Sequence, residues 1–180
     1  MKSLAIITSK SITFNRFLLE LTDSLSNNFK VTLCCQDSEN INNLKVIKGD
    51  LRNINDIKKA FESPRKEKKS IEAVIHLAGL KAVGESCSHP LRYWENNLMS
   101  SINLLKVLDQ FNCKNIVFSS SATVYKSKLN KLLNENDYCE PVNPYGQTKL
   151  SVEKLLDNFC LLYTSPSPRD RSLSRMPSSA

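Results

Sequence analysis

The sequence predicts an α/β fold, with a doubly wound parallel sheet in one globular domain. Short apolar runs of strand length alternate with stretches that repeat apolar residues every three or four positions. Strands separated by helices are joined by right-handed crossovers, which make the sheet parallel. A length of 180 residues, with 41% hydrophobic and 24% charged residues, is enough for one domain with a substantial core.

Each expected element follows from its own pattern of apolar residues. Buried strands are expected at residues 3–8, 30–35, 45–47, 73–79 and 115–121. Helices are expected at residues 14–27 and 91–110, where apolar residues recur at helical spacing. A further helix is expected to begin at Pro144, because proline suits a first helical turn, and to continue to residue 159.

Small polar residues follow two of the expected strands. Gly79 ends the fourth apolar run, and Ser119, Ser120 and Ser121 end the fifth. Sheets of this kind bind ligands in the crevice beyond the carboxyl ends of their strands. Glycine lets the backbone approach a ligand closely, and the serines bring hydroxyls to the same rim. The sequence therefore predicts a ligand site at this edge of the sheet.

Charge and hydropathy argue against two classes of partner. The net charge is +7, but the basic residues are scattered, and the densest group, at residues 65–69, contains Glu67. We expect a solvated loop there and no nucleic-acid partner. The apolar run at residues 3–8 is too short for a signal peptide, and no later run approaches membrane-spanning length. A cytoplasmic protein without a membrane partner is expected.

The cysteines are expected to be free thiols. The chain has six cysteines and two histidines, and it has no Cys-x-x-Cys pair, so no metal site is expected. Cys34 and Cys35 adjoin in an apolar run, where strand alternation would point them to opposite faces. Buried free thiols are typical of a reducing compartment.

The last twenty residues, 161–180, differ in composition from the rest. They hold six serines, three prolines and three arginines. This composition predicts a disordered tail, and the segment also resembles the artefactual peptides that result from translated sequencing adapters. The folded domain is therefore expected to span residues 1–160.

Tyr145 and Lys149 form a candidate proton-transfer pair. If the helix that begins at Pro144 continues past them, they lie one turn apart on one face. A phenol with a pKa of about 10 is a poor base at neutral pH, and a nearby ammonium lowers that value by favouring the phenolate. Such a tyrosine could take a proton from a sugar hydroxyl, while Ser121 hydrogen-bonds the same oxygen. A cofactor would have to accept the hydride.

Three stretches resemble the extended short-chain dehydrogenase/reductase family, and within it the UDP-glucose 4-epimerases. They are residues 76–105, 115–125 and 143–156, which include the runs AGLKAVGES, SSSATVY and NPYGQTK. The resemblance implies a Rossmann-like fold, NAD as cofactor and a UDP-hexose substrate oxidised at its 4-hydroxyl and reduced on the other face. It further implies that Tyr145 is the base, that Lys149 positions the nicotinamide ribose, and that Ser121 assists proton transfer, all three bordering NAD.

The same resemblance implies further contacts with NAD. Residues that border the bound NAD are Leu77, Ala78, Gly79, Leu80, Lys81 and Asn96, and those that meet its adenine are Asp50 and Leu51. His76 and Trp94 have no catalytic counterpart and are expected to be packing residues.

The turn after the first strand departs from the family pattern. Ser9, Ile12 and Asn15 stand where the family has glycines, so Thr13 and Phe14 are the residues expected to offer backbone amides to the pyrophosphate. The acidic residue expected to hold the adenosine ribose aligns with Cys35, or with Asp37 if the register slips by two; Asp37 is our choice.

The resemblance stops after Cys160, before the family's substrate domain. It therefore implies a truncated enzyme, homodimeric when full length, with the helix at 91–110 and the helix at Tyr145 as the dimerisation pair. Two alternatives stay open. One is another enzyme of the extended family on nucleotide sugars, a dehydratase or a different epimerase, although Thr123 stands where a dehydratase would have an acid. The other is a non-catalytic dinucleotide-binding relative.

Overall fold

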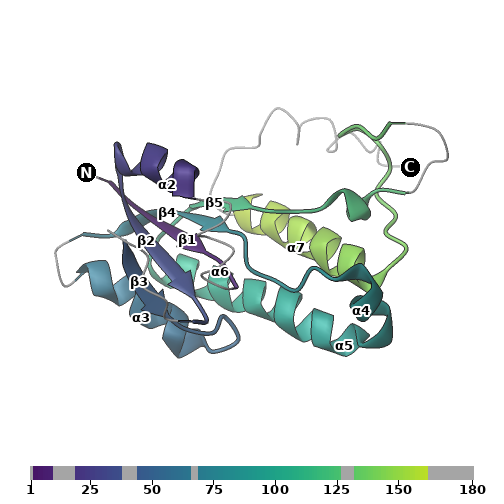
Figure 1. Cartoon of the computed structure of the whole chain (residues 1–180), viewed down its shortest axis with the longest axis horizontal. Helices are drawn as coiled ribbons and strands as arrows, with labels where there is room; N and C mark the ends of the chain where they lie inside the picture. The colour runs from purple at the N-terminus through teal and green to yellow at the C-terminus, as the bar shows by residue number, and fades with distance from the viewer. Residues whose placement is uncertain (1, 10–18, 38–43, 66–68, 127–131, 162–180) are drawn as a thin grey trace, which may run out of the picture.

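The computed structural model describes residues 2–9, 19–37, 44–65, 69–126 and 132–161. At its centre is a five-stranded parallel sheet in the order β3-β2-β1-β4-β5 (Figure 1). The strands are β1 (Lys2–Ile7), β2 (Phe29–Cys35), β3 (Lys45–Lys48), β4 (Ile71–His76) and β5 (Asn115–Phe118). The predicted α/β fold with a parallel sheet is confirmed.

Helices connect these strands. They are α2 (Leu19–Ser26), α3 (Ile54–Arg65), α4 (Val83–Ser88), α5 (Pro90–Tyr93), α6 (Ser100–Gln110) and α7 (Pro144–Leu161), with a π-helical segment η1 (Trp94–Met99) and a 3-10 turn η2 (Ala122–Val124). The helix expected at 91–110 is therefore a run of three segments, α5, η1 and α6. The sequence patterns did not predict α3.

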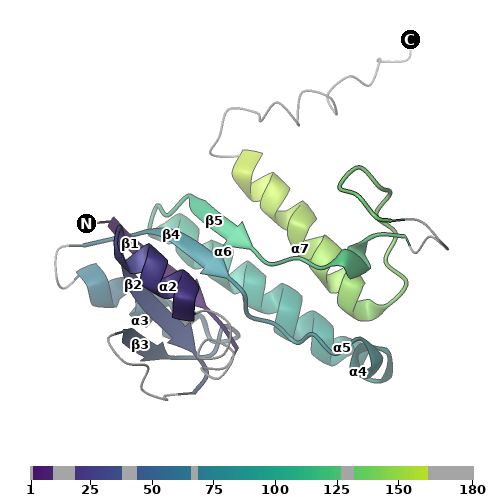
Figure 2. The same cartoon turned by 45° about the horizontal axis from the view of Figure 1, so that its top comes forward.

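Helices cover both faces of the sheet, as a doubly wound topology requires. On one face, Ala5 and Val74 of the sheet pack with Phe61 of α3 and Leu108 of α6. On the other, a second cluster that includes Leu33 packs against α2. Figure 2 shows α2 in front of the sheet and α6 behind it. Two apolar layers thus enclose the strands.

Alternation along β2 separates the two adjacent cysteines as predicted. Cys34 packs against the cluster on the α3 and α6 face, whereas Cys35 belongs to the cluster on the α2 face. Neither cysteine forms a disulfide. Burial raises the pKa of the Cys34 thiol to about 12, so this thiol remains protonated and unreactive.

Two predicted strands end earlier than their apolar runs. β4 ends at His76 and β5 at Phe118, and the last ladder bonds run from Leu77 N–H to the Ile7 carbonyl and from Ser119 N–H to the His76 carbonyl. Residues 77–79 and 119–121 therefore leave the sheet at its carboxyl edge. The chain turns away at Gly79, whose φ of 141° is one that residues with a side chain rarely adopt.

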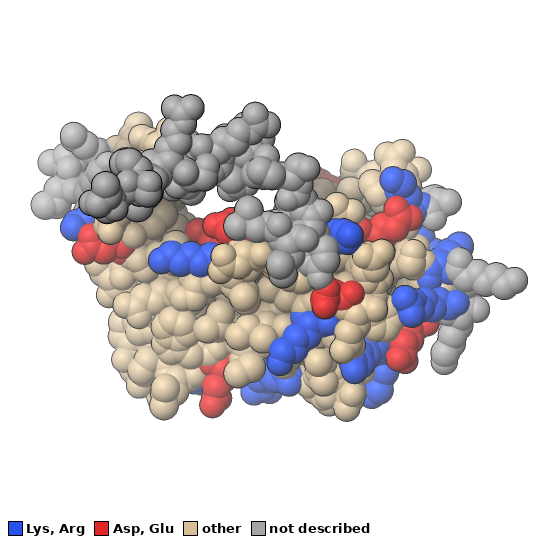
Figure 3. Space-filling model, turned by 180° about the vertical axis from the view of Figure 1, so that it is seen from behind, with Lys and Arg blue, Asp and Glu red and all other residues tan. Residues whose placement is uncertain are grey.

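Figure 3 shows the molecule from behind, with charged side chains of both signs interspersed over much of this face. The end that carries α4 and α5 in Figure 1 is mostly uncharged on this face. Within the described residues, no helix is long and apolar enough to cross a bilayer. Nor do the described histidines, cysteines and acidic residues form a group of three or more that could hold a metal ion. Of the predicted tail 161–180, only Leu161, the end of α7, is described.

Candidate functional site

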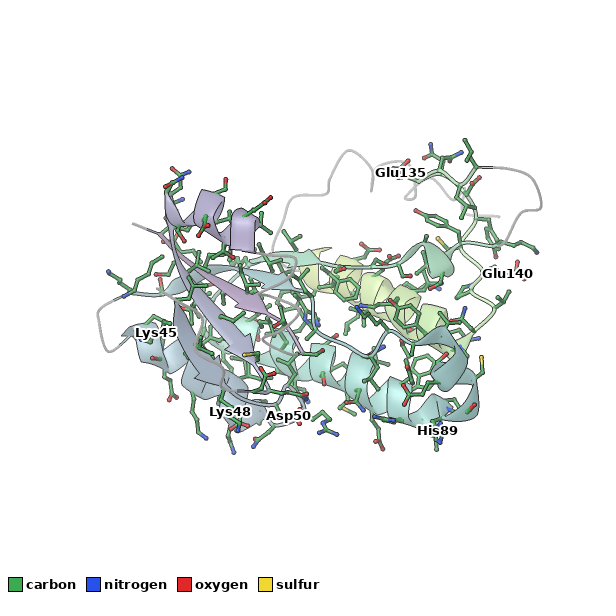
Figure 4. The ribbon with its side chains drawn as sticks, viewed as in Figure 1. Lys45, Lys48, Asp50, His89, Glu135 and Glu140 are labelled. Carbon is green, nitrogen blue, oxygen red and sulfur yellow. The ribbon has the colours of Figure 1, made fainter. Side chains whose placement is uncertain are left out.

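A cavity of about 300 Å³ opens at the carboxyl ends of β1, β2 and β4. Its floor is apolar and includes Ile7, Cys34 and Phe61. Seven residues predicted to contact a cofactor line it: Asp50, Leu51, Ala78, Gly79, Leu80, Lys81 and Asn96. Figure 4 shows Asp50 just beyond the ends of the strands, far from His89 at the other end of the molecule. The cavity is therefore where a doubly wound sheet binds its ligands.

Other predicted cofactor contacts lie elsewhere. Leu77 is packed with the apolar cluster on the α2 face, and Asp37 accepts a hydrogen bond at its carbonyl from the Cys35 thiol, at 3.1 Å. Neither residue lines the cavity. Thr13 and Phe14 fall outside the described residues. Of the two candidates for the ribose-binding position, Cys35 rather than Asp37 borders the cavity.

Asp50 lies at the rim with its charge already compensated. Arg52 donates to both carboxylate oxygens, with Nη2 2.6 Å from Oδ2 and Nε 3.1 Å from Oδ1. These hydrogen bonds hold the pKa of Asp50 below its usual value. The Asp50 carboxylate is therefore ionised and fixed in orientation beside the cavity.

Ser9 joins the end of β1 to the Gly79 turn. The Gly79 N–H donates to the Ser9 hydroxyl oxygen at 3.0 Å, and that hydroxyl lies 3.4 Å from the Gly79 carbonyl. A side chain at Gly79 would be strained by φ and would meet Asn97 Oδ1 at 3.0 Å. The position where the family has a glycine thus holds a serine that closes the turn.

Lys149 is buried beside this turn. Its side chain is only 5% exposed, and Nζ donates to the Ser119 carbonyl at 2.9 Å. Nζ also lies 3.8 Å from the position that a Gly79 Cβ would occupy, and 5.9 Å from the centre of the Tyr145 ring. Burial lowers the pKa of Lys149 to about 8, an effect that the Glu153 carboxylate opposes. The structure therefore brings Gly79, Tyr145 and Lys149 together.

Tyr145 is held by its neighbours on α4 and α5. Its backbone N–H donates to the Ser86 hydroxyl at 3.2 Å, and its ring meets the edge of Tyr93 with centroids 6.4 Å apart. Ser121, the third predicted catalytic residue, shares a 2.9 Å hydrogen bond with the Thr123 hydroxyl and accepts from Thr123 N–H, which caps η2. The Tyr145 ring is thus fixed, and the Ser121 hydroxyl is part of a local turn.

The start of α7 determines where Tyr145 and Lys149 lie. Asn143 caps the helix, because its Oδ1 accepts from Gly146 N–H at 2.8 Å and Pro144 fills the first helical position. A Cβ at Gly146 would lie 2.5 Å from the Thr123 carbonyl oxygen. Only glycine allows α7 to approach η2 this closely.

Asn97 is a central site residue that the sequence patterns did not reveal. Its Oδ1 accepts from Leu80 N–H at 2.8 Å, and its Nδ2 donates to the Leu80 carbonyl at 3.0 Å and to the Thr148 hydroxyl at 3.1 Å. The predicted Asn96 lines the cavity, but its amide donates to the Arg92 carbonyl. Asn97 lies in π-helical η1, a geometry often found at functional sites.

Tyr93 is a second residue at the site that the sequence patterns did not reveal. Its hydroxyl accepts from Ala82 N–H at 3.1 Å and lies 2.7 Å from the Ala82 carbonyl and 2.9 Å from Glu85 Oε2. Burial, followed by the Glu85 carboxylate, raises the pKa of Tyr93. The segment after Lys81 is thus fixed against α5.

His76, expected to be a packing residue, is buried under the site. Its Nε2 lies 3.1 Å from the Ser101 hydroxyl, which donates its own hydrogen to the Asn97 carbonyl at 2.7 Å. His76 Nε2 must therefore carry the ring hydrogen. Burial, and after it the charge of Lys149, lowers the pKa of His76 to about 3, so the ring is neutral at physiological pH.

A protein-family model described as GDP-mannose 4,6 dehydratase matches residues 17–168. The chain belongs to this family. The match includes α2 and the whole of α7, so every element that positions Tyr145 and Lys149 lies within the family region, whereas β1 and Ser9 precede it.

Similar proteins include several that are named UDP-glucose 4-epimerases. A "Bifunctional UDP-glucose 4-epimerase and UDP-xylose 4-epimerase 1" of Pisum sativum is 49% identical over 113 residues, 63% of this chain and 31% of its own. "UDP-glucose 4-epimerase 2" of Oryza sativa subsp. japonica is 41% identical over 142 residues, 77% of this chain and 34% of its own. The predicted resemblance to UDP-glucose 4-epimerases is confirmed, and the chain spans about a third of these relatives.

Solved structures agree with the sequence comparisons. A UDP-glucose 4-epimerase structure superposes with a TM-score of 0.76 at 27% identity, covering 89% of this chain and 48% of that one. A second, "UDP-glucose 4-epimerase from Bifidobacterium longum in complex with NAD+ and UDP", has a TM-score of 0.73 at 29% identity and covers 89% and 50%. The Rossmann-like fold is therefore confirmed, over about half of these enzymes.

Proposed function

We propose that this chain is the NAD-binding part of a UDP-glucose 4-epimerase. The observation that carries the proposal is the grouping of a buried lysine, a buried tyrosine and a glycine turn, Lys149, Tyr145 and Gly79, at the carboxyl edge of the sheet. An ammonium beside a phenol is what a tyrosine needs to act as a base near neutral pH.

The cavity suits NAD by its shape and its chemistry. At Gly79 the missing Cβ lets Asn97 and Lys149 pack close to the backbone of the turn, with Asn97 Oδ1 3.0 Å and Lys149 Nζ 3.8 Å from where a Cβ would lie. Asp50 and Leu51 would hold the adenine end, while Gly79, Leu80 and Lys81 would border the nicotinamide end. NAD, when bound, supplies the hydride acceptor that side chains lack.

The remaining chemistry belongs to the residues of the chain. Tyr145 takes the proton from the 4-hydroxyl of a UDP-hexose as that hydroxyl becomes a ketone. Lys149 favours the phenolate and holds the nicotinamide ribose, and Ser121 hydrogen-bonds the reacting oxygen. Tyr145 would return its proton to the oxygen when bound NAD supplies the hydride to the other face of the ketone, which would give the 4-epimer. Each cycle leaves the cofactor oxidised.

Properties of the complete enzyme are part of the same proposal. They are a UDP-hexose substrate, a place in galactose metabolism, a cytoplasmic location and a homodimer when full length. Support for the dimer comes from α6 and α7, which together line an open groove of about 320 Å³ that includes Leu105 and Phe159. We assign residues 1–160 to the NAD-binding domain and residues 161–180 to a tail outside it.

Titration of the chain with NAD tests the cofactor part of the proposal. Tryptophan fluorescence is a suitable signal, since Trp94 is the chain's only tryptophan and stands in the sequence between Tyr93 and Asn96, both of which line the cavity. Saturable binding is expected, and Gly79→Val should abolish it because the side chain would meet Asn97 Oδ1 at a strained φ and displace the turn that lines the cavity. Gly84→Ala is the matched control, since nothing lies within 4 Å of a Cβ there.

An epimerase assay on the complete polypeptide tests the reaction. Conversion of UDP-galactose to UDP-glucose is expected, with turnover lost in Tyr145→Phe while NAD binding is retained. NAD binding without conversion in the unsubstituted protein would instead favour a non-catalytic relative, an alternative supported by Ser9 in place of a glycine. Loss of UDP-galactose to a 4-keto-6-deoxy sugar would favour a dehydratase, although Thr123, which bonds Ser121, offers no acid for that step.

A further inference from the structure

Two consecutive serines connect the end of β5 to α7 through different atoms. Ser119 does so with its carbonyl, which accepts from Lys149 Nζ at 2.9 Å. Ser120 does so with its hydroxyl, which donates a short hydrogen bond to Glu153 Oε1. Lys149 and Glu153 are four residues apart, so the two contacts fall on successive turns of one face of α7. Tyr145 lies one turn before them on the same face.

Glu153 is the carboxylate that acts on Lys149. It opposes the effect of burial, which alone would favour the neutral amine. The other titratable groups near Lys149 are Tyr145 on α7 and His76 at the end of β4, and His76 is neutral because burial lowers its pKa to about 3. Glu153 also acts on Tyr125 and Cys139. Burial is the main cause of the raised pKa values of these two residues, and the charge of Glu153 raises them further.

The Ser120 hydrogen bond gives this carboxylate one orientation. Glu153 is half-buried, so without a partner its side chain could turn toward water. Ser120 lies between Ser119, whose carbonyl binds Lys149, and Ser121, which is proposed to assist Tyr145. The same contact therefore fixes the distance from the 119–121 segment to the helix.

We propose that Ser120 and Glu153 are positioning residues for Lys149: the serine hydroxyl holds the carboxylate one turn beyond the lysine, and the carboxylate keeps the buried ammonium charged. The inference deepens the proposed function, on which its relevance to catalysis rests. A charged Lys149 is required to favour the Tyr145 phenolate, and a neutral amine would not do so.

The test is a pH titration of Lys149 in the 180-residue chain without NAD or sugar. Lysine labelled with ¹³C at Cε reports amine protonation by NMR, and Lys149→Met identifies the resonance. Glu153→Gln, which keeps an oxygen for Ser120 but removes the charge, should lower the midpoint of the titration. Ser120→Ala should lower it less, and Ser120→Thr, which keeps a hydroxyl, should restore it. Asp157→Asn, the same charge change on an exposed residue one turn further along α7, is the control.

Several results of this titration would overturn the inference. A midpoint in Glu153→Gln that equals that of the unsubstituted chain would overturn it, as would a shift of the same size in Asp157→Asn. An equal effect of Ser120→Ala and Ser120→Thr would overturn the role of the hydroxyl. Spectra of the other lysines show whether each variant is folded. Because no ligand is present, failure of NAD binding or epimerase activity is a separate result and leaves the titration interpretable.

Discussion

Asn97 binds both backbone polar groups of Leu80, accepting from its N–H at 2.8 Å and donating to its carbonyl at 3.0 Å. The same amide nitrogen reaches the Thr148 hydroxyl, which in turn donates to the Tyr145 carbonyl at 2.7 Å. One side chain thus connects the turn at the cavity to the helix that carries Tyr145 and Lys149.

Replacement of Asn97 by alanine should destabilise the fold. The change removes three hydrogen bonds and leaves the Leu80 N–H and carbonyl without a partner in a half-buried setting, which costs about 2–4 kcal/mol in the free energy of unfolding. Urea denaturation measures it. Asn96→Ala is the control, because that amide makes one exposed contact with the Arg92 carbonyl, and a change below about 1 kcal/mol is expected. Equal effects of the two variants would contradict the role of Asn97.

Two glycines should respond to alanine in opposite directions. At Gly146 the new Cβ would lie 2.5 Å from the Thr123 carbonyl oxygen, so α7 must move and we expect a loss of about 1–3 kcal/mol. Gly84, in exposed α4, has nothing within 4 Å of a Cβ, and Gly84→Ala should raise stability by about 0.5–1 kcal/mol. Thermal unfolding of both variants checks the signs. A stabilised Gly146→Ala protein would show that α7 does not need this approach to η2.

Lys149 should make stability rise with pH in the alkaline range. Its pKa is lowered from 10.5 to about 8 in the folded state, so between these values the unfolded chain binds a proton that the folded chain does not. Burial therefore destabilises the fold below pH 8, by about 3 kcal/mol, and this cost is relieved as pH rises toward 10.5. The measurement is the difference in unfolding free energy between the chain and Lys149→Met from pH 7 to 10.5. A pH-independent difference would contradict the burial of a charged amine.

His76 should make the fold sensitive to acid. Its pKa is lowered from 6.5 to about 3, so the folded state favours the neutral ring and the unfolded state binds the extra proton in between. The stability contribution is complete above pH 6.5 and is lost as pH falls toward 3. In His76→Gln, which keeps a donor for Ser101, the unfolding free energy should depend less on pH between 6.5 and 3 than it does in the unsubstituted chain. Urea denaturation at several pH values measures it. Equal acid profiles for the two chains would show that His76 becomes protonated without unfolding.

Local sequence patterns were sufficient for the parts of the fold that depend on neighbours in the chain. The alternation of apolar runs and helical repeats predicted the parallel sheet, and adjacency within β2 predicted that Cys34 and Cys35 face opposite sides. Pro144 marked the first turn of α7, and the spacing of Tyr145 and Lys149 then put both on one helical face. Each of these inferences needs only the geometry of one element.

Contacts between distant elements could not be predicted in this way. Asn97 and Thr148 are 51 residues apart, and Ser120 and Glu153 are 33 apart, so no periodicity relates them. The choice between Asn96 and Asn97 also depends on η1, since a π-helical turn rotates its side chains away from the positions of an α-helix. Helix α3 was missed because its sequence, INDIKKAFESPR, is mainly polar and includes Pro64, although Ile57, Ala60 and Phe61 form a buried stripe.

The strand order has a consequence for the kinetics of folding. β1 lies in the middle of the sheet, where Ala5 pairs with Thr32 on one side and with Val74 on the other. During synthesis β1 can thus acquire β2 as a neighbour early, but it acquires β4 only after the chain through β4 has been synthesised. Such non-local pairing raises the contact order and slows the search for the native state. Until β4 is synthesised, one edge of β1 stays open to pairing with other chains, which is a route to aggregation during folding.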